Sequence, residues 1–551
     1  MYNKNHNEKE ILTLAFENHK KNKLKVAESL YKKIIKTNPN HFDSIFLLGS
    51  LSAQIGNFKA AEKYLNQAAK INPNSADTYH NLGIIYGTLE EYKKAIISSQ
   101  KAIEIQPNHI EAINHLGNLY KDLREFKKAK NCYERAIKIN PNFAKSYNNL
   151  GNILKELGEF EKAKIAYMKA IEIQPKNPNT YYNLGLLYKI LGNFTESEIA
   201  YKTSLKYQPE NLSTLYDISK LNNEVLNSNL KNEIKKHLGK KLSEKNKAYA
   251  NFLLSKYEIK NKNYKKEINF LIKGHSHYFN SERKKFEKAT NHWLYKLPKL
   301  KELEKISDFQ SIYNKIKPIF IIGVPRCGST LIEKIIASGP NNIPLGEETG
   351  IFSYFVGKRI NKKESLEENK GELHSQIYEK YNEKGLIKEK NNFIFTDKSL
   401  DNFFYIPLIK EIFPKSKIIN CKRDTTSSIM SILKTNLKDV SWAHDLNHIF
   451  KFFDLYFKKI EYFKKIFPNF IYELELEKFV SKPKEESKKL FDFCNLSWDE
   501  KCLEFYKRKD LISQTASNMQ IRKSIFKDGF KKYQPYKKFL KKYGKKYNWY
   551  K

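Results

Sequence analysis

Cysteine is scarce in this chain, which has five among its 551 residues. They stand at Cys132, Cys327, Cys421, Cys494 and Cys502, and they form no C-x-x-C pair and no even framework. This usage argues against a disulfide-stapled secreted domain and is typical of a reducing compartment. A run of about 18 consecutive apolar residues is also missing, and the N-terminal residues have no apolar signal segment. The sequence therefore predicts a cytoplasmic protein without a membrane span.

Acidic residues are too few to balance the basic ones: 61 stand against 100, which leaves a net charge of +39. Such a charge would suit nucleic acid, anionic lipid or a polyanionic substrate. The lysines are scattered along the whole chain, however, and we find no arginine-rich arm, zinc-finger spacing or RNP-type aromatic motif. We therefore expect solvated lysine-rich faces and no nucleic-acid partner. The length predicts about three domains.

The first part of the chain is periodic. Prolines recur every 34 residues, at Pro39, Pro73, Pro107, Pro141, Pro175 and Pro209. The last five follow a glycine by 24 residues, and the first five follow an alanine by 12. Small residues let two helices approach closely, and proline ends the second helix of each unit. The pattern resembles tetratricopeptide (TPR) repeats.

This resemblance implies an α-solenoid of six repeats over residues 1–211, with a groove suited to a protein or peptide partner. The alternative that the array only stabilises or dimerises the rest of the chain stays open. Residues 212–315 keep a helical pattern without the period, and we interpret them as a helical connector.

A strand, a glycine loop and a helix are predicted between Pro318 and Leu331. The apolar run 319–322 is typical of a strand buried in a parallel sheet. Gly323 and Gly328 have the spacing of a P-loop, but Ser329 stands where that motif has its lysine, and the cation is Arg326 instead. Glycines and a helix N-terminus together bind phosphate through backbone N–H groups. The residues expected to form this loop are Arg326, Cys327, Gly328, Ser329 and Thr330.

Three further segments carry polar side chains that could act in catalysis or bind phosphate. Gly346-Glu347-Glu348-Thr349 follows the loop helix, and Asp397-Lys398 ends a short predicted strand. A second buried strand ends at Arg423, and Ser431 follows eight residues later on a predicted helix. Asp397 alone could also be a Walker B aspartate that binds Mg²⁺, which would indicate a P-loop kinase.

Together with Thr515-Ala-Ser-Asn-Met-Gln-Ile-Arg522, these segments resemble sulfotransferases that use 3′-phosphoadenosine 5′-phosphosulfate (PAPS). The resemblance is to bacterial members joined to TPR arrays and to tyrosylprotein sulfotransferases. This chain departs from their motifs at Leu400, where they have proline, at 425–427, where they have Pro-x-Asp, and at Phe530, where they have tryptophan.

The resemblance implies a role for each matched residue. Glu348 would be the catalytic base, with Glu347 the alternative, and Arg326 and Lys398 would stabilise charge. Arg423 and Ser431 would bind the 3′-phosphate. Further contacts to PAPS would come from Ser517, Gln520, Arg522 and Lys527.

The expected architecture is therefore a TPR solenoid, a connector and, over residues 316–551, a P-loop-type α/β sulfotransferase domain with a parallel sheet. Within it, residues 357–392 would form an acceptor-side lid. PAPS would be the donor without a metal, and a protein tyrosine is the favoured acceptor hydroxyl. A carbohydrate or small-molecule acceptor, a kinase, and a TPR scaffold with an inactive transferase domain are the alternatives.

Overall fold

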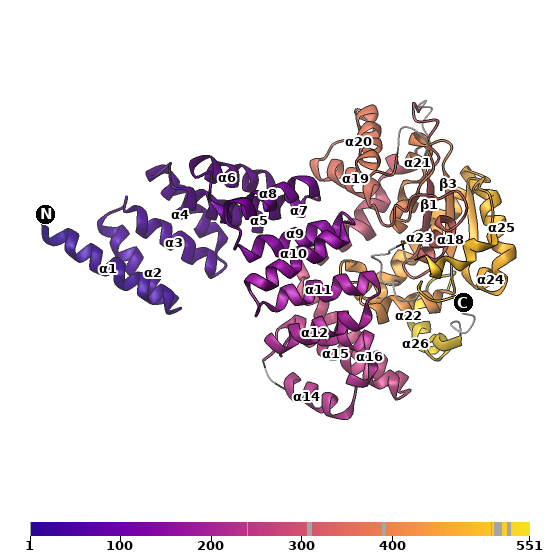
Figure 1. Cartoon of the computed structure of the whole chain (residues 1–551), viewed down its shortest axis with the longest axis horizontal. Helices are drawn as coiled ribbons and strands as arrows, with labels where there is room; N and C mark the ends of the chain where they lie inside the picture. The colour runs from indigo at the N-terminus through magenta and orange to yellow at the C-terminus, as the bar shows by residue number, and fades with distance from the viewer. Residues whose placement is uncertain are drawn as a thin grey trace. The chain divides into compact units, whose positions relative to one another are not determined.

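A computed structural model describes residues 2–239, 241–305, 311–387, 393–508, 510–511, 521–525 and 531–550 (Figure 1). The chain divides into two compact units. The first comprises Met1–Lys189 with Phe194–Pro209, and the second comprises Ile190–Asn193 with Glu210–Lys551. Within the described ranges, every helix is too short or too polar to traverse a bilayer.

The first unit consists of successive helix pairs, as the 34-residue period predicts. Each predicted proline falls in the turn that follows the second helix of a pair. The helices are α1 Tyr2–Lys20, α2 Leu24–Thr37, α3 Phe42–Gln54, α4 Phe58–Ile71, α5 Ala76–Thr88, α6 Tyr92–Ile105, α7 Ile110–Asp122, α8 Phe126–Ile139, α9 Ala144–Glu156, α10 Phe160–Ile173, α11 Pro178–Leu191 and α12 Phe194–Tyr207.

Small residues let the paired helices pack closely. The five periodic alanines, Ala27, Ala61, Ala95, Ala129 and Ala163, are completely buried. A Cβ atom added at Gly117 would lie 2.6 Å from the ring of Tyr133, and one at Gly151 would lie 2.6 Å from that of Tyr167. The glycines are therefore required because large buried tyrosines fill the space opposite them.

The connector region of the second unit is helical. Its elements are α13 Leu212–Leu221, η1 Asn223–Val225, α14 Ser228–Leu238, α15 Glu244–Lys260, α16 Tyr264–Ser281, α17 Arg283–Asn291, the π-helix η2 His292–Lys296, η3 Leu297–Lys299 and η4 Lys301–Glu304. Buried residues of these helices, such as Phe252 and Leu271, belong to the same hydrophobic cluster as the strands that follow. This region and the α/β domain therefore share one continuous core.

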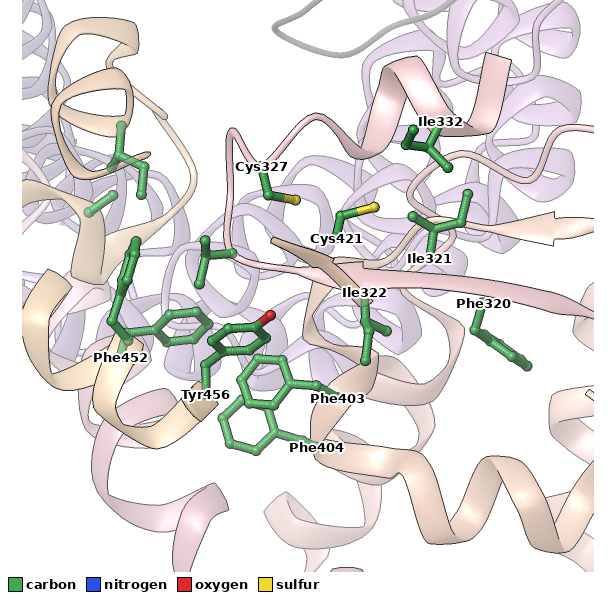
Figure 2. Close-up of a cluster of buried hydrophobic side chains, with 14 of the residues drawn as sticks. Phe320, Ile321, Ile322, Cys327, Ile332, Phe403, Phe404, Cys421, Phe452 and Tyr456 are labelled. Carbon is green, nitrogen blue, oxygen red and sulfur yellow. The ribbon is translucent and has the colours of Figure 1, made fainter. Parts of the chain in front are cut away.

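The α/β domain is built on a parallel sheet, as predicted. Its strand order is β2-β1-β3-β4, with β1 Ile319–Gly323, β2 Thr396–Asp397, β3 Lys417–Lys422 and β4 Ile471–Glu475. Every residue of β1 is buried. Figure 2 shows Phe320, Ile321 and Ile322 within this core, which explains the unbroken apolar run in the sequence.

Helices follow the strands of this sheet. They are α18 Ser329–Ala337, α19 Ile351–Lys362, α20 Lys370–Glu383, η5 Leu400–Tyr405, α21 Ile406–Ile412, α22 Thr425–Thr435, η6 Ser441–His444, α23 Leu446–Ile466, α24 Leu476–Ser481, α25 Pro483–Phe493, η7 Glu500–Lys507, η8 Lys531–Tyr536 and α26 Lys537–Gly544.

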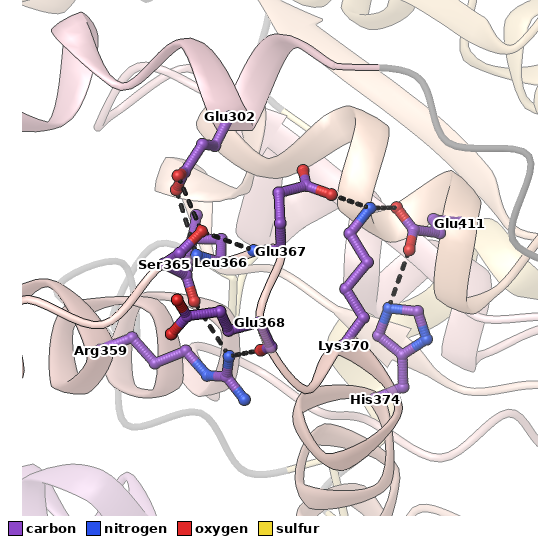
Figure 3. A network of polar contacts seen from close by, with 9 residues as sticks. All are labelled: Glu302, Arg359, Ser365, Leu366, Glu367, Glu368, Lys370, His374 and Glu411. Atoms are coloured by element: carbon purple, nitrogen blue, oxygen red, sulfur yellow. Dashed lines mark hydrogen bonds and ion pairs between the residues drawn. The ribbon is translucent and has the colours of Figure 1, made fainter.

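The predicted lid segment contains α19 and α20, and polar contacts fasten it to neighbouring elements (Figure 3). Arg359 donates hydrogen bonds to the carbonyls of Ser365 and Asn369, both at 3.1 Å, and so fixes the turn between the helices. Lys370 and His374 contact Glu411 of α21 at 3.4 and 3.1 Å. In this structure α20 is therefore anchored to α21, and Arg359 ties α19 to the turn that precedes α20.

Candidate functional site

The strand order reverses direction between β1 and β3. The chain passes from β1 to β2 on one side of β1 and then returns to β3 on the other side. At such a reversal the two loops diverge, and open α/β sheets bind ligands there. The loop after β1 begins at Gly323, and the loop after β3 contains Arg423, so the two predicted phosphate-binding corners lie at the same switch point.

The first corner has the backbone of a tight anion loop. Arg326 and Gly328 have φ angles of 72° and 96°, in the left-handed region. At Gly328 a Cβ atom would lie 2.7 Å from Leu476, so no larger residue fits. Ser329 and Thr330 open α18 and so lie at a helix N-terminus, where backbone N–H groups can bind an anion.

Cys327 differs from its neighbours in this loop. Its side chain is fully buried beside that of Cys421 (Figure 2). The side chain therefore packs beneath the loop, and Cys327 can serve a ligand only through its backbone.

The second corner lies directly against the first. Asp424 caps α22 by accepting a hydrogen bond from the backbone N–H of Ser427 at 2.7 Å, which places Arg423 at the end of β3. Arg423 Nη1 donates to the Arg326 carbonyl at 3.0 Å, and Arg326 Nε donates to Ser431 Oγ at 3.1 Å. The structure thus brings together three residues that are up to 105 positions apart in the sequence.

The electrostatics of this cluster are strongly positive. Burial lowers the pKa of the Arg326 guanidinium, and the neighbouring Arg423 cation lowers it further. Among the described residues, no carboxylate lies within ion-pair distance of Arg423, and its Nε atom is buried without a hydrogen-bond partner. A buried donor of this kind is costly unless an acceptor reaches it, so the cluster suits an anion.

Lys398 and Glu348 form a second group beside the loop. The Pro344 and Glu347 carbonyls accept hydrogen bonds from the backbone of Thr396 and Lys398, at 3.0 and 2.7 Å, which fastens the Glu-Glu segment along β2. Lys398 Nζ donates to Glu348 Oε1 at 3.0 Å. The Lys398 side chain is 0% exposed and that of Glu348 is 58% exposed, so the carboxylate is open to an incoming molecule while the ammonium is held below it.

One buried acidic residue beneath this pair, Glu333, was not predicted. Glu333 of α18 accepts hydrogen bonds from the Glu347 N–H at 3.0 Å and from Thr396 Oγ1 at 2.8 Å, and burial raises its pKa. Burial would lower the pKa of Lys398, but the nearby Glu348 and Glu333 outweigh it, so that this pKa is raised and Lys398 remains an ammonium. The signal was visible in the sequence as an acidic residue within an otherwise apolar helix segment.

Asp397, the candidate Walker B residue, has a positioning role. Its Oδ2 accepts hydrogen bonds from Thr349 and Tyr381, both at 2.5 Å. Its Oδ1 accepts from the Ser399 N–H at 2.8 Å and from Asn402 at 3.3 Å. Four bonds on a completely buried carboxylate fix the turn that carries Lys398.

The C-terminal candidates are described only in part. Ser517, Gln520 and Lys527 lie outside the described residues. Arg522 donates to the carbonyl of Ile190 at 2.9 Å and is close enough to Lys334 to lower the pKa of that lysine, which burial lowers most. Tyr533 of η8, which the sequence did not single out, lies against Arg423 with the guanidinium 5.8 Å from the ring centroid.

Comparison with protein-family models divides the chain as the fold does. A model of the sulfotransferase family matches residues 318–500. TPR models match residues 19–82, 76–109, 117–158, 151–192 and 178–211.

Two curated relatives match part of the chain. An uncharacterized protein of Aquifex aeolicus is 30% identical over 238 residues, which are 41% of this chain and 31% of that protein. A Caenorhabditis briggsae protein, named a putative protein-tyrosine sulfotransferase, is 23% identical over 220 residues, which are 38% of this chain and 77% of that protein. The chain thus spans about a third of the Aquifex relative.

Solved structures also match part of the chain. MamA is 28% identical with a TM-score of 0.28, over 29% of this chain and 95% of that one. A thermophilic TPR protein of Thermus thermophilus is 20% identical with a TM-score of 0.30, over 33% of this chain and 98% of that one. The family models show that this chain joins an N-terminal array of tetratricopeptide repeats to a sulfotransferase-family domain.

Proposed function

We propose that the α/β domain transfers the sulfuryl group of PAPS to an acceptor hydroxyl, and that a protein tyrosine is the acceptor. The observation that carries this proposal is the direct contact of Arg326 with both Arg423 and Ser431. Two strand-to-helix corners meet there, and a nucleotide with an anionic group at each end can reach both. An ordinary nucleoside triphosphate has no 3′-phosphate and would leave the second corner unused.

The residues present fit such a donor. The glycine loop and Arg326 would hold its 5′ end, and Arg423 and Ser431 would hold its 3′-phosphate. The buried Nε of Arg423 would gain the acceptor that it lacks among the described residues. When bound, PAPS supplies a sulfuryl group on its 5′-phosphate that can be transferred to an oxygen nucleophile.

Glu348 and Lys398 would act on different atoms of the reaction, the acceptor hydroxyl and the leaving oxygen. The exposed Glu348 carboxylate would take the proton of the acceptor hydroxyl as it attacks. Lys398, which stays protonated, would neutralise the charge that builds on the oxygen released from sulfur. A tyrosine phenol has a pKa of about 10, low enough for a carboxylate base to assist.

The name of the Caenorhabditis relative and the Glu347-Glu348-Thr349 segment support a tyrosine acceptor. The TPR array would recruit the protein that carries it. The four hydrogen bonds on Asp397 favour sulfuryl transfer over a kinase, because they already use the carboxylate that a Walker B role would offer to Mg²⁺.

Calorimetry with adenosine 3′,5′-bisphosphate and with ADP tests the donor. We expect the wild-type protein to bind the bisphosphate at least about tenfold more tightly, since a hydrogen bond to a charged group contributes about 1.5–3 kcal/mol. Arg423→Ala should remove this preference, and Arg283→Ala, which changes an exposed arginine on α17, should keep it. Tight binding of ADP with indifference to the 3′-phosphate would overturn the assignment.

A transfer assay tests the acceptor. With PAPS as donor, a tyrosine-containing peptide should be sulfated and its tyrosine-to-phenylalanine counterpart should not. Sulfation of an oligosaccharide with no transfer to any tyrosine peptide would replace the protein acceptor with a carbohydrate.

A further inference from the structure

Tyr533 occupies a central place in the cationic cluster. It lies on η8 and is only 6% exposed, although charged side chains surround it. The Arg423 guanidinium and the Lys434 ammonium lie 5.8 and 5.5 Å from its ring centroid. Lys532 lies 4.9 Å from the same centroid. Contacts of this kind hold an aromatic ring by cation–π attraction.

The hydroxyl of Tyr533 reaches the residues of the proposed 3′-phosphate site. It lies close enough to Ser431 and to Lys532 for both to lower its pKa. Ser431 Oγ at the same time accepts the hydrogen bond from Arg326 Nε. Because the Lys532 ammonium is a donor only, the Tyr533 O–H proton can be donated to a phosphate oxygen, while Ser431 donates its own proton to the same phosphate.

The electrostatic potential at this oxygen favours negative charge. Burial alone would raise the pKa of Tyr533, but Lys532, Ser431 and Arg423 outweigh it, and this pKa is lowered from its usual value. The neighbouring Tyr536 behaves in the opposite way, because burial and the Glu267 carboxylate raise its pKa. The two tyrosines are three residues apart, so the difference arises from their neighbours: the Glu267 carboxylate beside Tyr536, and Lys532 and Arg423 beside Tyr533.

Lys434 helps to position the Tyr533 ring, and we do not expect it to bind the phosphate. Its ammonium forms an ion pair with Glu267 of α16 at 2.8 Å and donates to the Tyr536 hydroxyl at 2.6 Å. Its charge is therefore already compensated, whereas among the described residues Arg423 has no carboxylate partner.

We propose that Tyr533 is a donor-selecting residue, whose hydroxyl binds the 3′-phosphate together with Ser431 and Arg423. This inference rests on the proposed function, because it names a further ligand for the same phosphate. It predicts that recognition of the 3′-phosphate depends on one phenolic oxygen contributed from the C-terminal segment, more than a hundred residues after Ser431.

The test compares adenosine 3′,5′-bisphosphate with adenosine 5′-phosphate by calorimetry. Tyr533→Phe removes one oxygen and keeps the ring, and it should weaken binding of the bisphosphate roughly tenfold or more. Binding of the monophosphate should stay within about twofold, since it has no 3′-phosphate. Tyr543→Phe is the matched control: its ring stacks on Phe450 away from the cluster, and both affinities should be unchanged.

A spectroscopic measurement separates a ligand from a structural support. Ultraviolet titration of the wild-type protein should reveal a tyrosine that ionises early, and Tyr533→Phe should lack it. Bound bisphosphate should move this ionisation to higher pH, because a nearby anion disfavours the phenolate.

Several results would overturn the inference. They are unchanged bisphosphate affinity in Tyr533→Phe, equal weakening of both ligands, or an ionisation indifferent to the bisphosphate. If the wild-type protein itself showed no preference for the bisphosphate, the proposed function would fail first, and the two failures are thereby distinguished.

Discussion

At the scale of single residues, the structure separates two adjacent carboxylates that the sequence left as alternatives. Glu348 extends toward solvent and contacts Lys398, while Glu347 has a left-handed backbone with a φ of 52°. The backbone N–H and carbonyl of Glu347 are both used to hold the segment, through Glu333 and Lys398. This division favours Glu348 as the group that meets an acceptor.

We therefore expect Glu348→Gln to lower kcat by about 10²–10⁴, the usual contribution of a general base. The affinity of the Glu348→Gln variant for adenosine 3′,5′-bisphosphate should stay within about twofold of the wild-type affinity, because the change lies away from the phosphate site. Glu347→Gln should lose less than about tenfold in kcat by the same reasoning. Steady-state kinetics and calorimetry on both variants give the answer, with Glu348→Asp as the control that keeps a carboxylate. The opposite order of effects would assign the base to Glu347.

At the scale of elements, the repeat glycines show how a sequence period becomes a packing requirement. Gly117 of α7 faces the ring of Tyr133 on α8, whose hydroxyl donates to Asn118 at 2.7 Å. The ring is therefore fixed from both sides and cannot move away from an added methyl group.

Gly117→Ala should destabilise the first unit by about 1–3 kcal/mol, since overpacking a filled contact outweighs the gain in helix propensity. Urea unfolding followed by circular dichroism measures the change. Gly357→Ala provides the contrast: this glycine lies within α19 with nothing within 4 Å of the new Cβ, and a gain of about 0.5–1 kcal/mol is expected there. Equal stability of Gly117→Ala and the wild type would show that the Tyr133 ring can move to accommodate the added methyl group.

The elements that sequence could predict are those with a local pattern. The 34-residue period gives the helix pairs, and the apolar runs at Ile319 and Ile418 give the central strands of the sheet. It could also be predicted that the phosphate-binding residues after these strands lie close together, because parallel strands bring their carboxyl ends to the same edge of a sheet. The contact between Arg326 and Ser431 required the strand order as well, which no local pattern contains. Tyr533 has no motif around it and is identified only by its neighbours in the fold.

At the scale of the second unit, the connector region is part of the α/β domain's core. Its helices contribute to the same hydrophobic cluster as the sheet. Polar contacts add to this: Glu267 pairs with Lys434 at 2.8 Å, and Asp217 lies 3.7 Å from Lys438. Both lysines lie on or just after α22, the helix that carries Ser431. Because these acids and bases are separated by more than 160 residues, the sequence could indicate helices here but not their role in supporting the phosphate site.

A buried histidine pair also connects α16 of the connector region to α22, and it makes the stability of this connection depend on pH. His275 of α16 donates from Nε2 to the Leu433 carbonyl of α22 at 2.8 Å, and its Nδ1 lies 2.9 Å from Nδ1 of His444. With its other nitrogen committed as a donor, His275 accepts a hydrogen bond at Nδ1. A proton added there would face the N–H of His444, so both rings are held neutral.

Burial lowers the pKa of His275 to about 4 and that of His444, which also lies beside His275, to about 2. The unfolded chain has histidines with a pKa of about 6.5, so on acidification it binds protons before the folded state does. The stability that His275 contributes is therefore complete above pH ~6.5 and declines as the pH falls toward its folded pKa. From pH 7 to pH 5 the part of this loss that His275 contributes should be about 2 kcal/mol in the free energy of unfolding.

Urea unfolding of the whole chain at both pH values measures this loss, with tryptophan fluorescence as the probe, because all four tryptophans lie in the second unit. His275→Gln cannot be protonated and should flatten the dependence by about that amount, even if it lowers stability at pH 7. His237→Gln, which changes a histidine on α14 that has no contact with the pair, should leave the slope unchanged. An unaltered slope in His275→Gln would mean that the connection between α16 and α22 does not depend on the neutral ring, and that acid acts on the second unit elsewhere.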